Sequence, residues 1–435
     1  AASLLPQMQP GPRDLKIDDS IQQGALLANE RPIPPQKIGL AVLLVYCLHN
    51  GWNCWTFLNA SSDMDSTKSL LGVNESEIGM LNTTGLLGIL CFLPLATVCK
   101  WPRLLLWLGA ILNLASPILR FFGARMGSYG LVLASFAGNG ASYGILGVWP
   151  PIISSVFFRE NRHALSTAAA LLSNWLGGAL AAIFIPVMTG GTGDGLLNLL
   201  RVQAYICIGL ALLTSCWLWI PNVIASSSLS LWSELQACCK SPVSSQIACF
   251  GIVTSVAIVL QNVNPMLLVG VGVSEVSAGI GNCLFQIAGA VIGVGLGALV
   301  TCRRHLQQVI RCLQAVALLS FVSMFPLCWV VSQQGCSNYA VVALLAILTM
   351  QGVSVVGLLP FVVQQAVYSA YPATENFVCG VVTTIGMAVG AGVTQLSASI
   401  PAIYAFAFLM VVMCLQTFFF AWHDCRSPSA ALESA

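Results

Sequence analysis

The chain has 435 residues, of which 57% are hydrophobic and 7% are charged, with a formal net charge of +2. Soluble domains carry about 25% charged residues, so this composition excludes a single soluble globule and indicates a polytopic membrane protein. The near-neutral net charge gives no sign of nucleic-acid binding. The 17 cysteines lie mostly in apolar runs, without the spacing of a disulfide framework or a zinc site.

Residues 1–37 contain six prolines and four basic residues, but no apolar run of signal-peptide length. Such a segment cannot bury enough apolar surface to fold alone, and it predicts a disordered cytosolic tail.

Twelve apolar segments follow, each able to cross a hydrocarbon core of about 30 Å as a helix. They are expected at residues 38–58, 78–99, 104–123, 128–157, 164–188, 200–222, 246–270, 275–300, 306–331, 339–365, 376–397 and 400–422. A lipid-embedded backbone must satisfy its own hydrogen bonds, and no barrel-like alternation appears. The sequence therefore predicts an all-α membrane protein with twelve transmembrane helices.

Basic residues are unevenly distributed among the expected loops. With the N-terminus in the cytosol, only four of the 17 basic residues lie on the outer side: Lys68, Arg120, Arg125 and Arg201. The positive-inside rule then predicts that both termini are cytosolic, including a short tail at residues 423–435. Two glycosylation sequons, at Asn59 and Asn74, fall in the first outer loop.

A Ser-rich cytosolic linker at residues 223–245 divides the chain into two six-helix halves, 38–222 and 246–422. In each half, a Glu-Asn pair precedes an Ile-Pro pair by 25 residues, and this register aligns Gly177 with Gly392. The repeat, the equal span counts and matched basic loops predict a duplicated unit. This layout resembles the major facilitator superfamily, which implies that the halves rock about a site at the membrane midplane.

The first span carries polar and aromatic residues at mid-depth. His49, Trp52 and Asn53 share one helical face, because they are three or four residues apart. Such a face is expected to line a bundle interior or a solute cavity rather than to contact lipid. Helix packing with satisfied polar groups is the alternative.

Other spans carry further candidates for a substrate site, each of which could instead be a hydrogen-bonded structural group. These candidates are Asn174, Trp175, Gln261, Asn282, Gln286 and Gln351. The small-residue pairs Gly140/Gly144 and Ser173/Gly177 favour close helix packing.

No Asp, Glu, Lys or Arg lies deep inside any expected span, and His49 is the only group there that titrates near neutrality. Proton-coupled carriers usually place carboxylates at this depth, so the pattern favours an uncoupled facilitator. A cationic solute would then be held by aromatic faces and amides. No nucleotide-binding, hydrolase or metalloprotease motif appears, which predicts a protein that is not an enzyme and has no cofactor.

Several motifs resemble the feline leukaemia virus subgroup C receptor-related transporters. They are Trp52-Asn53-Cys54-Trp55, Phe157-Phe158, Leu165-Ser166-Thr167-Ala168, Ser173-Asn174-Trp175-Leu176-Gly177-Gly178, Tyr371-Pro372-Ala373-Thr374-Glu375 and Cys379-Gly380-Val381-Val382-Thr383. The first and last of these are most similar to the pyridoxine-transporting branch.

The resemblance implies transport of haem, choline, ethanolamine or pyridoxine, with Trp52 at the position of a substrate-facing tryptophan. Choline-type members carry Gln at the positions of Trp175 and Met387, and an aromatic residue at that of Ala257, so the implied cage differs here. We therefore expect a facilitative transporter that moves a small organic solute by alternating access, as a monomer in the plasma membrane or an endolysosomal membrane. A haem exporter and a non-transporting receptor or scaffold are the alternatives.

Overall fold

The computed structural model describes residues 36–99, 102–214, 217, 230–240, 243–299, 303–371 and 373–424. The two expected tails fall almost wholly outside these residues. The described part of the chain is helical throughout, without strands.

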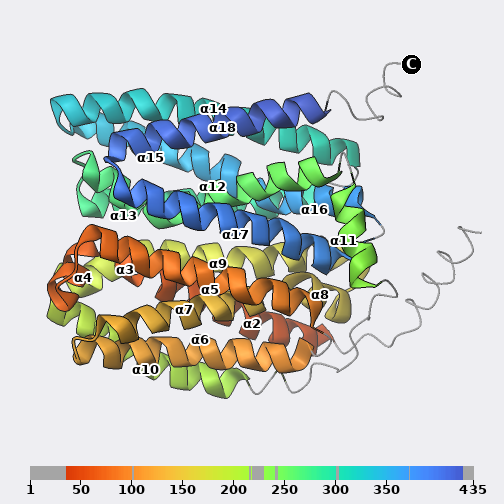
Figure 1. Ribbon diagram of the computed structural model, residues 1–435, viewed down its shortest axis with the longest axis horizontal. Coiled ribbons are helices and arrows are strands. Elements are labelled where there is room, and N and C mark those ends of the chain that lie inside the picture. Colours follow the sequence, from red (N-terminus) through yellow and green to blue (C-terminus); the bar gives the residue numbers. More distant parts are fainter. Residues whose placement is uncertain are drawn as a thin grey trace, which may run out of the picture.

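The helices that precede the expected linker run along one another in the lower part of Figure 1. They are α2 (Gln36–Phe57), α3 (Asn59–Ser62), α4 (Met64–Leu71), α5 (Glu75–Val98), α6 (Pro102–Arg125), α7 (Tyr129–Leu146), α8 (Trp149–Phe157), α9 (Glu160–Thr189) and α10 (Gly193–Leu213).

The helices of the second group lie above them in the same view. They are α12 (Val243–Gly270), α13 (Glu275–Leu299), α14 (Arg303–Gln334), α15 (Asn338–Gln351), a π-helical turn η2 (Gly352–Val356), α16 (Leu359–Ala370), α17 (Glu375–Ser399) and α18 (Ala402–Asp424). The short α11 (Leu231–Cys239) lies at the end of the bundle near α8 and α16 (Figure 1).

Within the described residues, ten helical segments are long and apolar enough to cross a membrane. This finding shows a helical, multi-pass membrane protein. Helix lies within each of the twelve expected segments. The sixth of them, 200–222, is covered by α10 only as far as Leu213, and its residues 215–216 and 218–222 lie outside the described residues. The segments around α2 and α7 are not among the ten. His49 and the asparagines of α2, and Asn139 with several glycines in α7, lower the mean hydropathy of these two helices.

Two expected spans are interrupted in the structure. Pro150 and Pro151 stand in the first turn of α8, where their missing N–H groups are tolerated, and α7 ends just before them. The tenth expected span passes from α15 through η2 into α16. The expected linker is not wholly irregular either, since α11 lies within it and Glu234 accepts a hydrogen bond from the backbone N–H of Thr374 at 3.2 Å.

Glycines allow close helix contacts at the centre of the bundle. A Cβ atom at Gly177 of α9 would collide with the carbonyl of Gly51 in α2, and one at Gly140 of α7 would collide with the carbonyl of Gly85 in α5. The small-residue pairs therefore act as packing surfaces, as expected. Gly392, which the repeat register aligns with Gly177, has no such contact, because no atom lies within 4 Å of an added Cβ there.

The two groups of helices meet along two pairs, α5 with α17 and α9 with α13. In the first pair, the Thr83 hydroxyl donates to the Gln395 side-chain oxygen at 2.9 Å. In the α9–α13 pair, Gly279 packs so closely on α9 that an added Cβ atom would lie 2.6 Å from the carbonyl oxygen of Ala182. The central cavity lies between these two contact lines.

Candidate functional site

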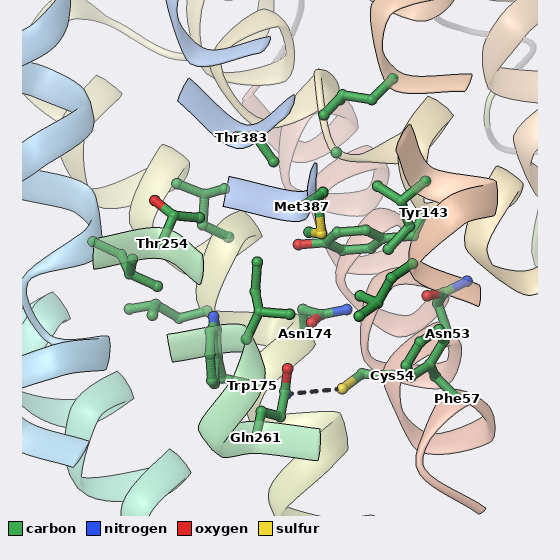
Figure 2. Close-up of a pocket in the computed structure, with 18 of the residues that line it drawn as sticks. Asn53, Cys54, Phe57, Tyr143, Asn174, Trp175, Thr254, Gln261, Thr383 and Met387 are labelled. Carbon is green, nitrogen blue, oxygen red and sulfur yellow. Dashed lines mark hydrogen bonds between the residues drawn. The ribbon is translucent and has the colours of Figure 1, made fainter. Parts of the chain in front are cut away.

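A cavity with about 1020 Å³ of empty space, part of it open to solvent, lies between the two groups of helices. Both groups contribute to its wall (Figure 2). The lining residues that carry polar or aromatic groups are Asn53, Phe57, Tyr143, Asn174, Trp175, Thr254, Gln261, Asn262 and Thr383, together with the sulfur-bearing Cys54, Cys379 and Met387.

None of the residues that line this cavity is charged. Its wall combines three aromatic rings, those of Phe57, Tyr143 and Trp175, with amide and hydroxyl groups. Trp175 also packs edge-on against Phe285, with ring centroids 6.3 Å apart, so its ring is held in place. Such a wall suits a neutral or singly cationic organic molecule, which aromatic faces can attract without a counter-charge.

A polar cluster closes one side of the cavity. The side-chain amide of Gln261 donates to the Cys54 sulfur at 3.1 Å and to the Gln286 oxygen at 2.9 Å, and the first of these bonds is drawn in Figure 2. Gly178 of α9 leaves room for the cluster, since an added Cβ would reach all three side chains. The cluster joins α2 of the first group to α12 and α13 of the second, so relative movement of the groups must break it.

Five of the ten candidates for the substrate site line the cavity, and five do not. Asn53, Asn174, Trp175, Gln261 and Met387 belong to its wall, whereas His49, Trp52, Asn282, Gln286 and Gln351 do not. Gln286 and Asn282 hold Gln261 in place through hydrogen bonds. The Gln286 side-chain oxygen accepts from the Gln261 amide at 2.9 Å, and the Asn282 amide donates to the Gln261 backbone carbonyl at 3.2 Å. Gln351 is buried in α15, away from the cavity.

His49 belongs to a polar network inside the first group of helices. Its Nε2 atom lies 2.9 Å from the hydroxyl of Thr214, and its Nδ1 atom lies 3.3 Å from the amide nitrogen of Asn113. Asn53 shares this network, since its amide donates to Asn113 at 3.0 Å and to the Asn139 carbonyl at 2.9 Å. The two residues do share a face, as expected, but that face points mainly into the first group.

Trp52 faces away from the central cavity, contrary to the expectation. Its indole nitrogen is buried and lies beside the thiol of Cys207 in α10. Trp52 immediately precedes Asn53 in α2, and consecutive side chains of an α-helix point about 100° apart, so Asn53 can line the cavity while Trp52 does not. Trp55 also points elsewhere, stacking on Phe184 of α9 with centroids 6.2 Å apart.

The two sequons differ in their surroundings. Asn74 is exposed and caps α5, where its side chain accepts a hydrogen bond from the backbone N–H of Glu77 at 3.0 Å. Asn59 is only 2% exposed, and its side-chain amide is paired with that of Gln203. A glycan on Asn59 is incompatible with this arrangement, because it needs the same nitrogen in solvent.

Sequence reasoning did not select several lining residues, including Tyr143, Thr254 and Thr383. A usable signal existed for Tyr143, because Gly140 and Gly144 mark the face of α7 that contacts α5. Tyr143 lies between these two glycines in the sequence, so its side chain projects beside the α5–α7 contact and into the central cavity. Thr254 and Thr383 carry no comparable signal.

Within the described residues, no group of three histidine, cysteine, aspartate or glutamate side chains could hold a metal ion. No protein-family model matches the chain, and no curated protein shows significant similarity to it.

Proposed function

We propose that this protein is a facilitative transporter that moves a small organic solute by alternating access, on the layout of the major facilitator superfamily. The observation that supports the proposal best is the central cavity, whose wall is shared between the two groups of helices. A site shared in this way is exposed to either side when the groups rock about it.

The chemistry of the wall supports a solute that is neutral or carries one positive charge. Choline, ethanolamine and pyridoxine are such molecules, and they are the solutes implied by the resemblance to the feline leukaemia virus subgroup C receptor-related transporters, nearest the disrupted in renal carcinoma protein 2 branch. Haem is disfavoured, because the cavity wall offers no basic side chain for its two propionates. A non-transporting receptor would have no need of a cavity between two separable groups.

Uptake into proteoliposomes tests the proposal. The purified chain is reconstituted, and entry of radiolabelled choline, ethanolamine and pyridoxine is measured against protein-free liposomes. We expect saturable uptake of at least one solute, down its gradient and without an imposed pH difference. The Trp175→Ala variant should lose affinity, while Trp329→Ala, which removes a half-exposed tryptophan on the outside of α14, should behave as the parent.

Absence of uptake for all three solutes, with folded protein in the membrane, would remove them as substrates. If equilibrium dialysis then shows binding of one of them without transport, the receptor alternative replaces the transporter.

A further inference from the structure

The central cavity contains hydrogen-bond donors that the protein itself does not use. Tyr143 of α7, Trp175 of α9 and Thr383 of α17 line the cavity, and their side chains have no hydrogen-bond partner among the described residues. The indole nitrogens of Trp52 and Trp55 are unpartnered too, but protein encloses them, whereas that of Trp175 is not enclosed. Figure 2 shows the Trp175 nitrogen and the Tyr143 hydroxyl turned toward the space between the lining residues. These donors are therefore available to a solute.

Hydrogen-bond acceptors line the same cavity. The amide nitrogen of Asn174 donates to the backbone carbonyl of Asn50 at 3.0 Å, and that of Asn53 donates to the backbone carbonyl of Asn139 at 2.9 Å. Because a backbone carbonyl can only accept, these bonds fix which end of each amide carries the nitrogen. The side-chain oxygens of Asn174 and Asn53 accept no hydrogen bond from the described residues and are not enclosed, so each amide offers an acceptor at the wall.

The hydroxyl of Tyr143 lies between the two groups of helices. Its side chain is within electrostatic reach of Cys54 in α2 and of Cys379 in α17. Cβ atoms added at Gly140 or Gly144 would meet the backbone of α5, which fixes the position of α7 beside the cavity. A solute that forms a hydrogen bond with this hydroxyl is therefore placed between the groups.

A wall that offers donors and acceptors together selects among the polar groups of a solute. A quaternary ammonium forms no such hydrogen bond, a primary ammonium can only donate, and a carboxylate can only accept. A hydroxyl does both through one oxygen, because it can accept from Tyr143 or Trp175 while it donates to an amide oxygen. A site that pairs a solute hydroxyl rejects the analogue that lacks it, because the groups of the wall are then left unpaired.

We propose that the central cavity recognises the hydroxyl group of a small alcohol, and that Tyr143 is the specificity-determining residue that donates a hydrogen bond to it. The aromatic wall holds the rest of the solute, neutral or singly cationic. This inference rests on the proposed function, because it names the class of solute that the same cavity takes. It adds a selection by hydrogen bonding to the attraction that the aromatic faces supply.

Three pairs of probes that differ by one hydroxyl test the inference: choline with ethyltrimethylammonium, ethanolamine with ethylamine, and pyridoxine with 4-deoxypyridoxine. Equilibrium dialysis of the full-length purified protein in nanodiscs measures each dissociation constant. We expect the hydroxylated member of at least one pair to bind roughly tenfold more tightly than its analogue. Tyr143→Phe should remove this preference, because it weakens binding of the hydroxylated probe alone.

The lost hydroxyl has no partner within the protein, so the unfolding midpoint of Tyr143→Phe should equal that of the parent. Tyr205→Phe is the matched control, because it removes the hydroxyl of an exposed tyrosine in α10, and it should bind every probe as the parent does. Equal binding within every pair, or equal weakening of both members by Tyr143→Phe, would overturn the inference and leave the transporter proposal standing. Absence of binding by all six probes would overturn it as well. Hydroxyl-selective binding without uptake would retain the inference and overturn the transporter instead.

Discussion

Two tryptophans on neighbouring helices show how local chemistry and spatial position differ. Trp52 lies in the polar, aromatic stretch that marks α2, yet it packs beside Cys207. Trp175 lies in a stretch typical of helix packing, yet it lines the central cavity. The residue type and depth of both could be read from the sequence. Their directions could not, because consecutive side chains on a helix point about 100° apart, which is enough to turn one of them out of the cavity.

Trp175→Ala is expected to weaken solute affinity by about 1–2 kcal/mol, roughly tenfold, because an aromatic face of the cavity wall is lost. Trp175→Phe should recover part of the affinity. Solute binding and the amount of folded protein are measured on the same samples. The geometry predicts unchanged affinity for Trp52→Ala; the opposite ranking of the two alanine variants would favour the site implied by the family resemblance.

His49→Ala is expected to destabilise the protein by about 1–3 kcal/mol, because Thr214 and Asn113 lose a buried partner. The remaining folded protein should take up solute with the same rate at equal and unequal pH across the membrane, since His49 lies outside the central cavity. Thermal unfolding and proteoliposome uptake measure the two effects. Accumulation driven by a pH difference, and lost only in this variant, would show that His49 carries protons.

At the scale of helices, the sequence predicted where elements lie but not how some of them end. Helix lies within every expected span over its described residues, because a membrane-crossing helix requires a long apolar segment, which is visible in the sequence. The Pro150-Pro151 pair was a visible signal for the boundary between α7 and α8. Helices α3 and α4 were not predicted, because such short helices depend on tertiary contacts such as that between Asp63 and Thr189.

Gly177→Ala is expected to destabilise the protein by about 1–3 kcal/mol, because the new Cβ collides with the carbonyl of Gly51 and forces α9 away from α2. Gly392→Ala is the matched control in α17. It meets no atom within 4 Å, and the better helix propensity of alanine should stabilise it by about 0.5–1 kcal/mol. Unfolding midpoints in one detergent compare them. Equal midpoints would mean that the α2–α9 contact is looser than described.

At the scale of the whole molecule, two groups of helices meet along α5 with α17 and α9 with α13. Composition and the repeated Glu-Asn and Ile-Pro pairs predict two six-helix halves. The sequence carried no prediction of which helices meet between the groups, because these contacts join helices that are far apart in the chain. The cavity between them is lined by side chains from seven helices, so no single stretch of sequence could predict its wall.

A disulfide between the groups is expected to stop transport if they must separate. Thr83 and Gln395 are hydrogen bonded at 2.9 Å across the α5–α17 contact, so Thr83→Cys with Gln395→Cys places two thiols close together. Oxidation should abolish uptake, and a reducing agent should restore it. Oxidised wild-type protein serves as the control, because oxidation of the native cysteines could itself change uptake.

Lys68→Cys with Glu75→Cys provides the control pair, because these residues form an ion pair at 2.8 Å within the first group. Its disulfide should leave uptake unchanged. Full uptake by the oxidised Thr83/Gln395 pair, once the cross-link is verified by mass spectrometry, would argue against separation of the groups at this contact.

The uncharged wall of the central cavity has an electrical consequence. A carrier whose moving site holds no fixed charge transfers only the charge of its solute in each cycle, and its empty return step is insensitive to voltage. One positive charge crossing 100 mV changes free energy by about 2.3 kcal/mol, close to a fiftyfold concentration ratio. A cationic solute should therefore accumulate toward a negative interior set by a potassium diffusion potential, whereas a neutral one should only equilibrate.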